Sequence, residues 1–216
     1  HLHPLSNAGY YPTAMPLDFK LIFEVPSGRI LGAQAVGYTG VEKRIDVIAT
    51  AIAGGLTVRD LEDVELAYAP PFSSAKDPVN MAGYVATNIL DGLVKTVTVD
   101  KIDDLVAQGA FLIDVRTPEE YELGSIEGAI NIPLDELRDR LDEIPKDEEV
   151  YVTCQVGLRG YLSTRILTQN GYRPINLDGG YSSYSQLKLN VNKESNADSL
   201  GGLGIACTDN SDVIKK

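Results

Sequence analysis

Apolar and polar residues alternate along the first part of the chain in the way that β-strands require. Residues 1–15 are irregular and rich in Pro, Gly, Asn and Tyr, and residues 17–25 then follow a period of two. A Pro-Ser-Gly turn signal comes next, and residues 29–37 return with strand-like residues. The pattern predicts a β-hairpin over residues 17–37.

The period then changes to that of α-helices. Apolar residues recur at helical spacing before a Gly pair, which predicts a helix over residues 41–55. A second helix is expected to start at a Thr57 cap and to end before a Pro pair, and a third is expected over residues 75–92. Residues 1–93 are therefore predicted to form a small α+β domain.

From residue 95 onward, strand patterns alternate with helical ones. Strands are expected at the start of this part and at 110–116, 129–133, 149–154 and 174–180, with helices at 117–124, 134–144, 158–171 and 181–189. Such alternation is typical of a mostly parallel sheet covered by helices, so residues 95–189 are predicted to be an α/β domain. Residues 190–216 are polar and Gly/Ser-rich, which predicts a flexible tail or linker.

Composition and charge exclude several classes of partner. The 216 residues are 44% hydrophobic and carry a net charge of −12, which repels phosphate, so neither nucleic acid nor a membrane is expected as a partner. No apolar run approaches the ~20 residues that span a bilayer. The two cysteines, Cys154 and Cys207, suggest a reducing compartment, and we expect a cytoplasmic protein. No signal peptide is evident, and the chain starts abruptly at His1 with loop-like residues and no initiator methionine, so we expect the tail of a longer polypeptide.

Cys154 stands where a predicted strand meets a predicted helix. In an open α/β sheet, ligands bind at this edge, where backbone N–H groups and the helix N-terminus favour a thiolate over a thiol. Arg159 can add positive charge, and Gly157 lets the turn tighten. Such a site suits a cysteine that carries sulfane sulfur as a persulfide. The alternative is a small buried hydrophobe at the end of a strand.

Three segments of the second domain are similar to motifs of a known family: "LIDVRTPEEYELGSIEGAINIP", the loop "CQVGLR", and "NLDGGYSSYSQ". With them, residues 95–189 resemble a single rhodanese domain. The resemblance implies that Cys154 accepts and donates sulfur, with Arg159 in the same loop. This sequence departs from the family pattern at Ser125 and Glu127, in a turn where many members have His and Pro.

The resemblance also implies roles for other residues. Asp114 and Arg116 match the family's D-x-R, where we expect a structural role. The loop residues expected to bind the sulfur substrate through their N–H groups are Gln155, Val156, Gly157 and Leu158.

In the first domain, "GYYPTA", "GRILGAQAVGYTGVEKRIDVIATAI" and "ELAYAPPFSSAKDPVNMAGYVA" resemble the dimerisation domain of flavin-dependent pyridine nucleotide–disulfide reductases. The last segment is most similar to the coenzyme A-disulfide reductase branch, which includes members with a fused rhodanese domain. The resemblance implies a homodimer through residues 1–93. It also implies that Tyr10 and Tyr68 reach the partner's active site, with Tyr11 as the alternative to Tyr10. From local sequence alone, both are ordinary surface aromatics.

Several residues and cofactors are less closely specified. Lys76 is expected either to contact a coenzyme A phosphate or to be an ordinary lysine at a helix start. No G-x-G-x-x-G fingerprint is present, so FAD and NAD(P)H are implied only for a full-length protein. His1 and His3 are not expected to bind metal. Cys207 is expected to be a free thiol, or a relay partner for Cys154.

Three functions are consistent with these features. The first is a C-terminal fragment of a flavin-dependent reductase of coenzyme A disulfides, persulfides or polysulfides, with a rhodanese domain whose Cys154 accepts sulfane sulfur and presents it to the reductase site. Sulfane sulfur donors and small thiols are the expected partners. The second is a free-standing thiosulfate or polysulfide sulfurtransferase. The third is a non-catalytic binding module, which the intact C-x4-R loop disfavours.

Overall fold

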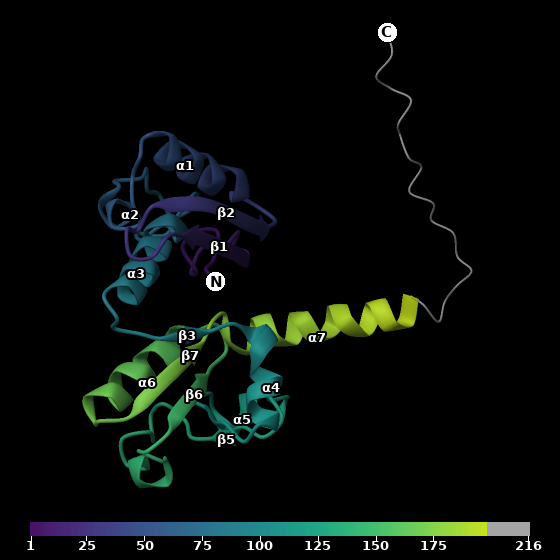
Figure 1. Ribbon diagram of the computed structural model, residues 1–216. Helices are drawn as coiled ribbons and strands as arrows, with labels where there is room; N and C mark the ends of the chain where they lie inside the picture. Colours follow the sequence, from purple (N-terminus) through teal and green to yellow (C-terminus); the bar gives the residue numbers. More distant parts are fainter. Residues whose placement is uncertain (198–216) are drawn as a thin grey trace.

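The structure is a computed structural model that describes the backbone of residues 1–197 and the side chains of residues 1–189. Figure 1 shows two units, joined by the segment between α3 and β3. Cys207, for which a role was predicted, lies outside the described residues. The elements of the first unit are β1 (Leu17–Phe23), β2 (Ile30–Gly37), α1 (Val41–Ala53), α2 (Asp60–Asp63) and α3 (Pro78–Leu90).

The first unit is the predicted α+β unit. β1 and β2 pair antiparallel, which confirms the hairpin. The helices α1 and α3 also confirm the sequence pattern, and α3 begins at a capping box formed by Asp77 and Asn80. Phe19, Ile48 and Val79, from the hairpin and these two helices, are buried in one core.

The second predicted helix is largely wrong, because α2 is a single turn. Thr57 caps no helix; its N–H and hydroxyl both donate to the Asp60 carboxylate, each at 2.7 Å. After α2 the chain is extended at Val64. The side-chain amide of Asn80 donates to the carbonyls of Leu61 and Val64, both at 2.9 Å, and so replaces the hydrogen bonds of a longer helix.

A buried ion pair ties the irregular segments of this unit together. Arg44 of α1 is 1% exposed, and its Nη2 lies 2.9 Å from Oδ2 of Asp77, which is 2% exposed. The same Nη2 donates to the carbonyl of Ser6 at 2.7 Å, and the hydroxyl of Ser73 donates to Asp77 at 2.7 Å. Arg44 and Asp77 therefore connect the N-terminal loop to the loop before α3.

The second unit is the predicted α/β domain. Its strands form a five-stranded parallel sheet in the order β3-β7-β6-β4-β5. The strands are β3 (Thr96–Val97), β4 (Phe111–Asp114), β5 (Ile130–Asn131), β6 (Glu149–Thr153) and β7 (Arg173–Leu177). The helices are α4 (Ile102–Ala107), α5 (Pro118–Glu122), α6 (Leu158–Gln169) and α7 (Gly180–Ala197), with 3₁₀ turns at Val99–Lys101 and Leu141–Glu143.

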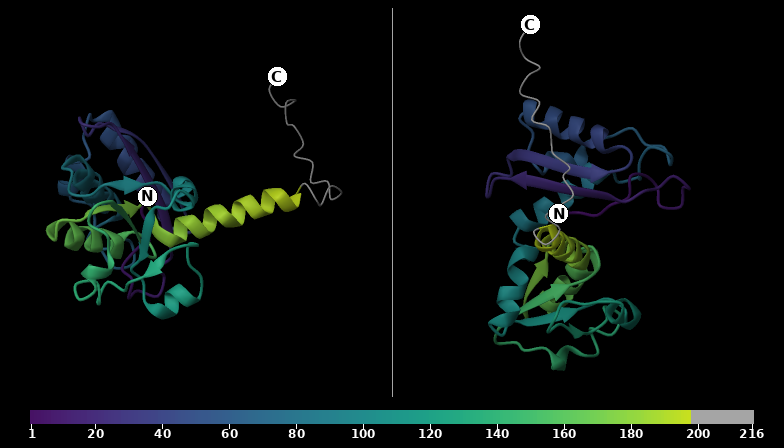
Figure 2. Two further views of the ribbon diagram at one scale, coloured as in Figure 1. Left: turned by 60° about the horizontal axis from the view of Figure 1, so that its bottom comes forward. Right: turned by 90° about the vertical axis from the view of Figure 1, so that its right-hand side faces the viewer.

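Side chains of the sheet alternate between two cores, one on each face. Val150 and Val152 of β6 pack with Leu167 of α6, whereas Tyr151 packs with Ile102 of α4 on the opposite face. Figure 1 shows α6 on one side of the sheet and α4 and α5 on the other. The helix α7 continues to Ala197 and extends away from both units, so the irregular tail does not begin at residue 190 (Figure 2).

The amphipathic helix predicted over residues 134–144 is wrong. This segment forms turns and one 3₁₀ turn between Pro133 and Pro145, and Arg140 leaves the helical region at φ −118°. Its apolar residues are nevertheless in the core, with Leu137 and Ile144 buried. The burial was therefore predicted correctly, while tertiary packing overrides the helical propensity.

The N-terminal segment contacts both units. Nδ1 of His3 pairs with the carboxylate of Asp18 in β1, and its Nε2 lies 2.8 Å from the Ser183 hydroxyl in α7. Both views of Figure 2 place the N-terminus beside the start of α7. Between residues 1 and 197, no helix has the length and hydropathy needed to cross a bilayer.

The buried pair in the first unit gives a stability prediction. Arg44→Met should lower the free energy of unfolding by about 3 to 5 kcal/mol, because it leaves the Asp77 carboxylate buried with only Lys43, at 3.7 Å, as a charged partner. Urea unfolding followed by circular dichroism measures the change. Arg29→Met is the matched control, since Arg29 and Glu24 form an exposed ion pair whose loss should change little. Equal effects of the two substitutions would contradict the structural role of the buried pair.

Candidate active site

Cys154 lies at the carboxyl end of β6, where the sheet meets the start of α6. It is 1% exposed, and its Sγ accepts a hydrogen bond from the N–H of Gly157 at 3.1 Å. Gly157 has φ 103° and precedes the first residue of α6. Such a positive φ favours glycine, which explains why the turn needs this residue. The thiol is therefore at the base of a short loop whose backbone turns toward it.

The start of α7 holds the first two carbonyls of this loop from outside. The N–H of Tyr181 donates to the carbonyl of Cys154 at 2.7 Å, and the N–H of Ser182 donates to that of Gln155 at 2.9 Å. The C=O and N–H of one trans peptide point in opposite directions. The N–H groups of Gln155 and Val156 therefore point away from α7, and within the described residues neither has a hydrogen-bond partner.

The carbonyl of Gly157, the last residue of the loop, is held from the helix side. It accepts hydrogen bonds from the N–H of Tyr161 at 2.9 Å and from Nδ2 of Asn176 at 3.3 Å. By the same geometry the Leu158 N–H points the opposite way, again without a partner among the described residues. The loop thus presents several free N–H groups around one sulfur, an arrangement that binds anions.

The Gly-Gly pair after β7 allows α7 to approach the loop. Gly180 has φ +60°, and a Cβ at this position would lie 2.4 Å from the carbonyl oxygen of Cys154. No side chain fits in that space. The pair was part of the family motif, but its contact with the loop is visible only in the structure.

Arg159 forms an ion pair with Glu120. Its two terminal nitrogens lie 2.6 and 2.7 Å from the two carboxylate oxygens of Glu120 in α5. This hydrogen bonding lowers the pKa of Glu120 from 4.5 to about 2. Glu120 also raises the pKa of Arg159, with smaller contributions from Cys154 and Asp114. The positive charge predicted near Cys154 is therefore present, but it is shared with Glu120, which the sequence analysis did not identify.

Asp114 and Arg116 form a buried pair beside the loop. The Arg116 side chain is 2% exposed, and its Nη2 lies 2.7 Å from Asp114 and 2.7 Å from the carbonyl of Gly124. Its Nη1 donates to Oε1 of Gln155 at 3.2 Å, and its guanidinium lies 4.1 Å from the centre of the Tyr181 ring. These contacts join β4, the loop and α7, and the structural role of the pair stays a prediction.

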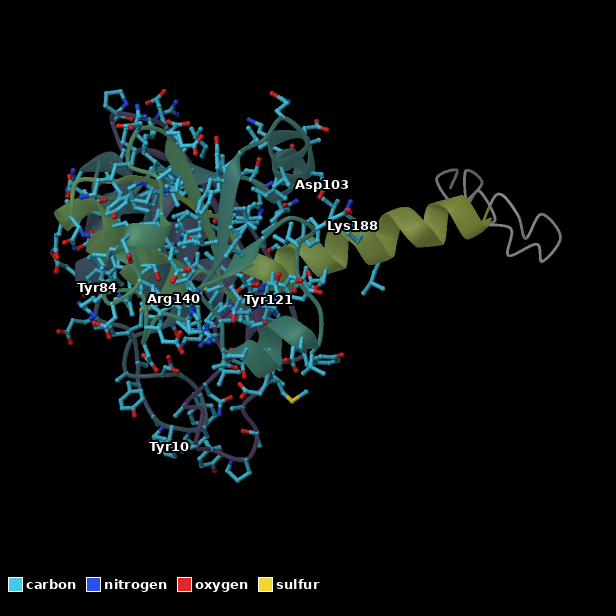
Figure 3. All side chains as sticks on the ribbon, turned by 90° about the horizontal axis from the view of Figure 1, so that it is seen from below. Tyr10, Tyr84, Asp103, Tyr121, Arg140 and Lys188 are labelled. Atoms are coloured by element: carbon cyan, nitrogen blue, oxygen red, sulfur yellow. The ribbon has the colours of Figure 1, made fainter. Side chains whose placement is uncertain are left out.

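Tyr10 and Tyr68 come from segments far apart in the sequence and lie together. The pKa of Tyr10 is raised mainly by a hydrogen bond with Tyr68. Both side chains are exposed, by 78% and 51%. Figure 3 shows Tyr10 on a loop that projects from the rest of the molecule. The choice between Tyr10 and Tyr11 stays a prediction.

A cleft of about 410 Å³ lies between the two units and borders the loop. Its walls include Val156, Gly157 and Leu158 from the loop and Met81 and Tyr84 from α3. The predicted residue Lys76 also lines it, with Nζ placed 4.3 Å from the centre of the Tyr84 ring, which Figure 3 labels. Neither tyrosine of the exposed pair lines the cleft, so the structure does not bring them to Cys154.

Comparison with known families agrees with the two units. Residues 1–79 match the pyridine nucleotide-disulphide oxidoreductase dimerisation domain, and residues 98–187 match the rhodanese-like domain. Each of the two units therefore resembles one of these families. The chain is a dimerisation domain of the coenzyme A disulfide reductase type, followed by a rhodanese-like domain. Both matches lie inside the predicted domains 1–93 and 95–189, whose boundaries stay predictions.

Curated relatives resemble the dimerisation domain. The coenzyme A disulfide reductase of Staphylococcus epidermidis is 47% identical over 81 residues, which cover 38% of this chain and 18% of that protein. The enzyme of the same name from Staphylococcus haemolyticus is 45% identical over 84 residues, 39% of this chain and 19% of that protein. The chain thus spans less than a fifth of the length of these relatives.

Two solved structures resemble both domains together. Reduced CoADR-RHD of Bacillus anthracis is 57% identical with a TM-score of 0.85, over 88% of this chain and 34% of that one. The NAD-dependent persulfide reductase from A. fulgidus is 43% identical with a TM-score of 0.76, over 85% of this chain and 33% of that one. The rhodanese-like domain therefore follows the dimerisation domain in these structures as it does here.

The ion pair of Glu120 predicts a pH dependence of stability. Because the folded-state pKa is about 2, below the ordinary 4.5, ionised Glu120 stabilises the rhodanese-like domain above about pH 4.5. This contribution is lost as the pH falls from there toward 2. Thermal unfolding of Glu120→Gln should therefore differ from the parent at neutral pH and converge with it in acid. Glu122→Gln is the control on the same helix. A difference that persists unchanged near pH 3 would contradict the assignment.

Proposed function

We propose that the chain is the C-terminal part of a flavin-dependent NAD(P)H reductase of coenzyme A disulfides, persulfides or polysulfides. In this proposal its rhodanese-like domain carries sulfane sulfur on Cys154. The main support is the hydrogen bond from Gly157 to the Cys154 sulfur, at the base of a loop with further free N–H groups. The similarity to coenzyme A disulfide and persulfide reductases supports the reductase part.

The sulfur exchange follows from the loop geometry. The Cys154 thiolate attacks the outer sulfur of thiosulfate or of a persulfide, a new S–S bond forms, and the donor's S–S bond breaks. Sulfite or a thiolate leaves with the electron pair, and the terminal sulfur on Cys154 carries the negative charge. Free N–H groups directed at that position stabilise the charge without reorganisation. A small thiolate or cyanide then takes the outer sulfur, and Cys154 leaves as a thiolate. This exchange consumes no oxidant or reductant.

The rest of the reductase lies outside this chain. The 216 residues hold no G-x-G-x-x-G fingerprint, so the residues present do not fit FAD or NAD(P)H, and we assign both cofactors to the full-length protein. The dimerisation domain supports a homodimer through residues 1–93. Within it, we propose that Tyr10 and Tyr68 serve the partner's active site, where a phenol can bond a thiolate or give a proton to a leaving sulfur.

Lys76 is proposed to bind coenzyme A. It lines the cleft that borders the Cys154 loop, and its ammonium group can attract a phosphate there. The cleft walls supplied by Met81, Val85 and Val94 are apolar, which suits the uncharged arm of such a carrier. The sulfur donors and acceptors at this end are proposed to be sulfane compounds and small thiols. The alternative, a free-standing sulfurtransferase, is supported by a complete sheet and loop in the described rhodanese-like domain.

The sulfurtransferase proposal is tested on the chain as it stands. Cys154→Ser should abolish cyanide-dependent formation of thiocyanate from thiosulfate, because it removes the nucleophile. Cys207→Ser is the matched control and should retain the activity. Turnover that survives in Cys154→Ser, or disappears in Cys207→Ser, would show that another group carries the sulfur.

The proposed role of the tyrosine pair is tested in the full-length protein. Tyr68→Phe should slow NAD(P)H-dependent reduction of coenzyme A disulfide by ~10²-fold, the typical cost of losing a positioned proton donor. It should leave thiocyanate formation by the rhodanese-like domain unchanged. Tyr38→Phe, which alters another exposed phenol of the same domain, is the control. If Tyr68→Phe impairs sulfur transfer but not reduction, the phenol does not belong to the reductase site.

A further inference from the structure

Asn176 is a buried polar residue in β7, directly beside the strand that ends at Cys154. It is 7% exposed and pairs with Val152 of β6 in the sheet register. Its neighbours Ile175 and Leu177 pack in the core on the α4 side, so Asn176 faces α6. An amide in this position costs free energy unless it is hydrogen-bonded, and within the described residues its Oδ1 has no partner. Stability alone therefore does not account for an asparagine here.

The one hydrogen bond of this side chain goes to the Cys154 loop. Nδ2 of Asn176 donates to the carbonyl of Gly157 at 3.3 Å. The same carbonyl accepts from the Tyr161 N–H at 2.9 Å, whereas the carbonyls of Cys154 and Gln155 accept from N–H groups of α7. Together with the Tyr161 N–H, Asn176 fixes the peptide between Gly157 and Leu158, and so directs the Leu158 N–H the opposite way.

The start of α6 leaves room for the Asn176 amide by having no side chain at Gly160. A Cβ at that position would lie 2.1 Å from Oδ1 of Asn176. Gly160 is helical, and alanine would be the better helix former there. The glycine is thus explained by the amide that packs against it.

We propose that Asn176 is a positioning residue of the sulfur-carrying loop, with Gly160 as its packing partner. With the Tyr161 N–H, it holds the Gly157 carbonyl so that the Leu158 N–H joins the Gly157 N–H in facing the charged sulfur on Cys154. The inference rests on the proposed sulfur-transfer function. It goes further in assigning the anion binding of the loop to a side chain outside the C-x4-R motif.

The test separates positioning from stability. Asn176→Leu keeps the number and branching of side-chain heavy atoms while removing both polar atoms, so the unfolding midpoint should hold or rise. The rate of thiocyanate formation should nevertheless fall by about five- to tenfold, the worth of one hydrogen bond. The pH at which alkylation of Cys154 by iodoacetamide reaches half its maximal rate should increase. Ser163→Ala is the control. The Ser163 hydroxyl, in α6, is also buried without a hydrogen-bond partner among the described residues, and its loss should change neither readout.

A second variant keeps the test decisive if Asn176→Leu does not fold. Gly160→Ala displaces the amide without removing it and should shift the alkylation profile in the same direction. A parent-like profile in Asn176→Leu, or in Gly160→Ala if that is the variant that folds, overturns the proposal. Alkylation needs no sulfur donor, so it tests Asn176 even if the parent chain lacks sulfurtransferase activity. That lack of activity would count against the proposed function and not against the positioning role.

Discussion

The hydrogen bonds from the start of α7 to the carbonyls of Cys154 and Gln155 are the contacts on which the candidate active site depends. The four residues between β6 and α6 do not by themselves fix which way their peptides face. Once the carbonyls are held from outside, the planar trans peptide leaves the N–H groups directed the other way. The start of α7 can approach the Cys154 loop for three reasons. The sheet order places β7 beside β6, the Gly-Gly pair has no side chain in the way, and the loop is short.

Charge plays a smaller part at the sulfur than the presence of two arginines suggests. Arg116 is paired with Asp114, and Arg159 is paired with Glu120. Each carboxylate cancels much of the field that its arginine would exert on a neighbouring anion. The backbone N–H groups have no such counter-charge, so they supply the stabilisation that remains. The arginines, in turn, hold α5, β4 and the loop in place.

The sequence was sufficient for features that depend on local pattern. The strand, the cysteine and the following helix could be placed from "VYVTC" and the C-x4-R spacing. Residues 134–144 show where this fails, because their apolar spacing fits a helix while the core accepts the same side chains from turns. Asn176 and Glu120 were missed, since each acts through a contact distant in sequence that no local period encodes.

The two sets of proposed functional residues lie apart within one chain. The Cys154 loop opens on the cleft between the units, whereas Tyr10 and Tyr68 lie on exposed loops that do not line it. Under the proposed function, sulfur held on Cys154 must therefore travel before it is reduced. A charged terminal sulfur is stable in the loop only while the N–H groups surround it. A small thiol that enters the cleft can take the sulfur off Cys154 as a soluble persulfide. Such a carrier links the two sites without direct contact between them.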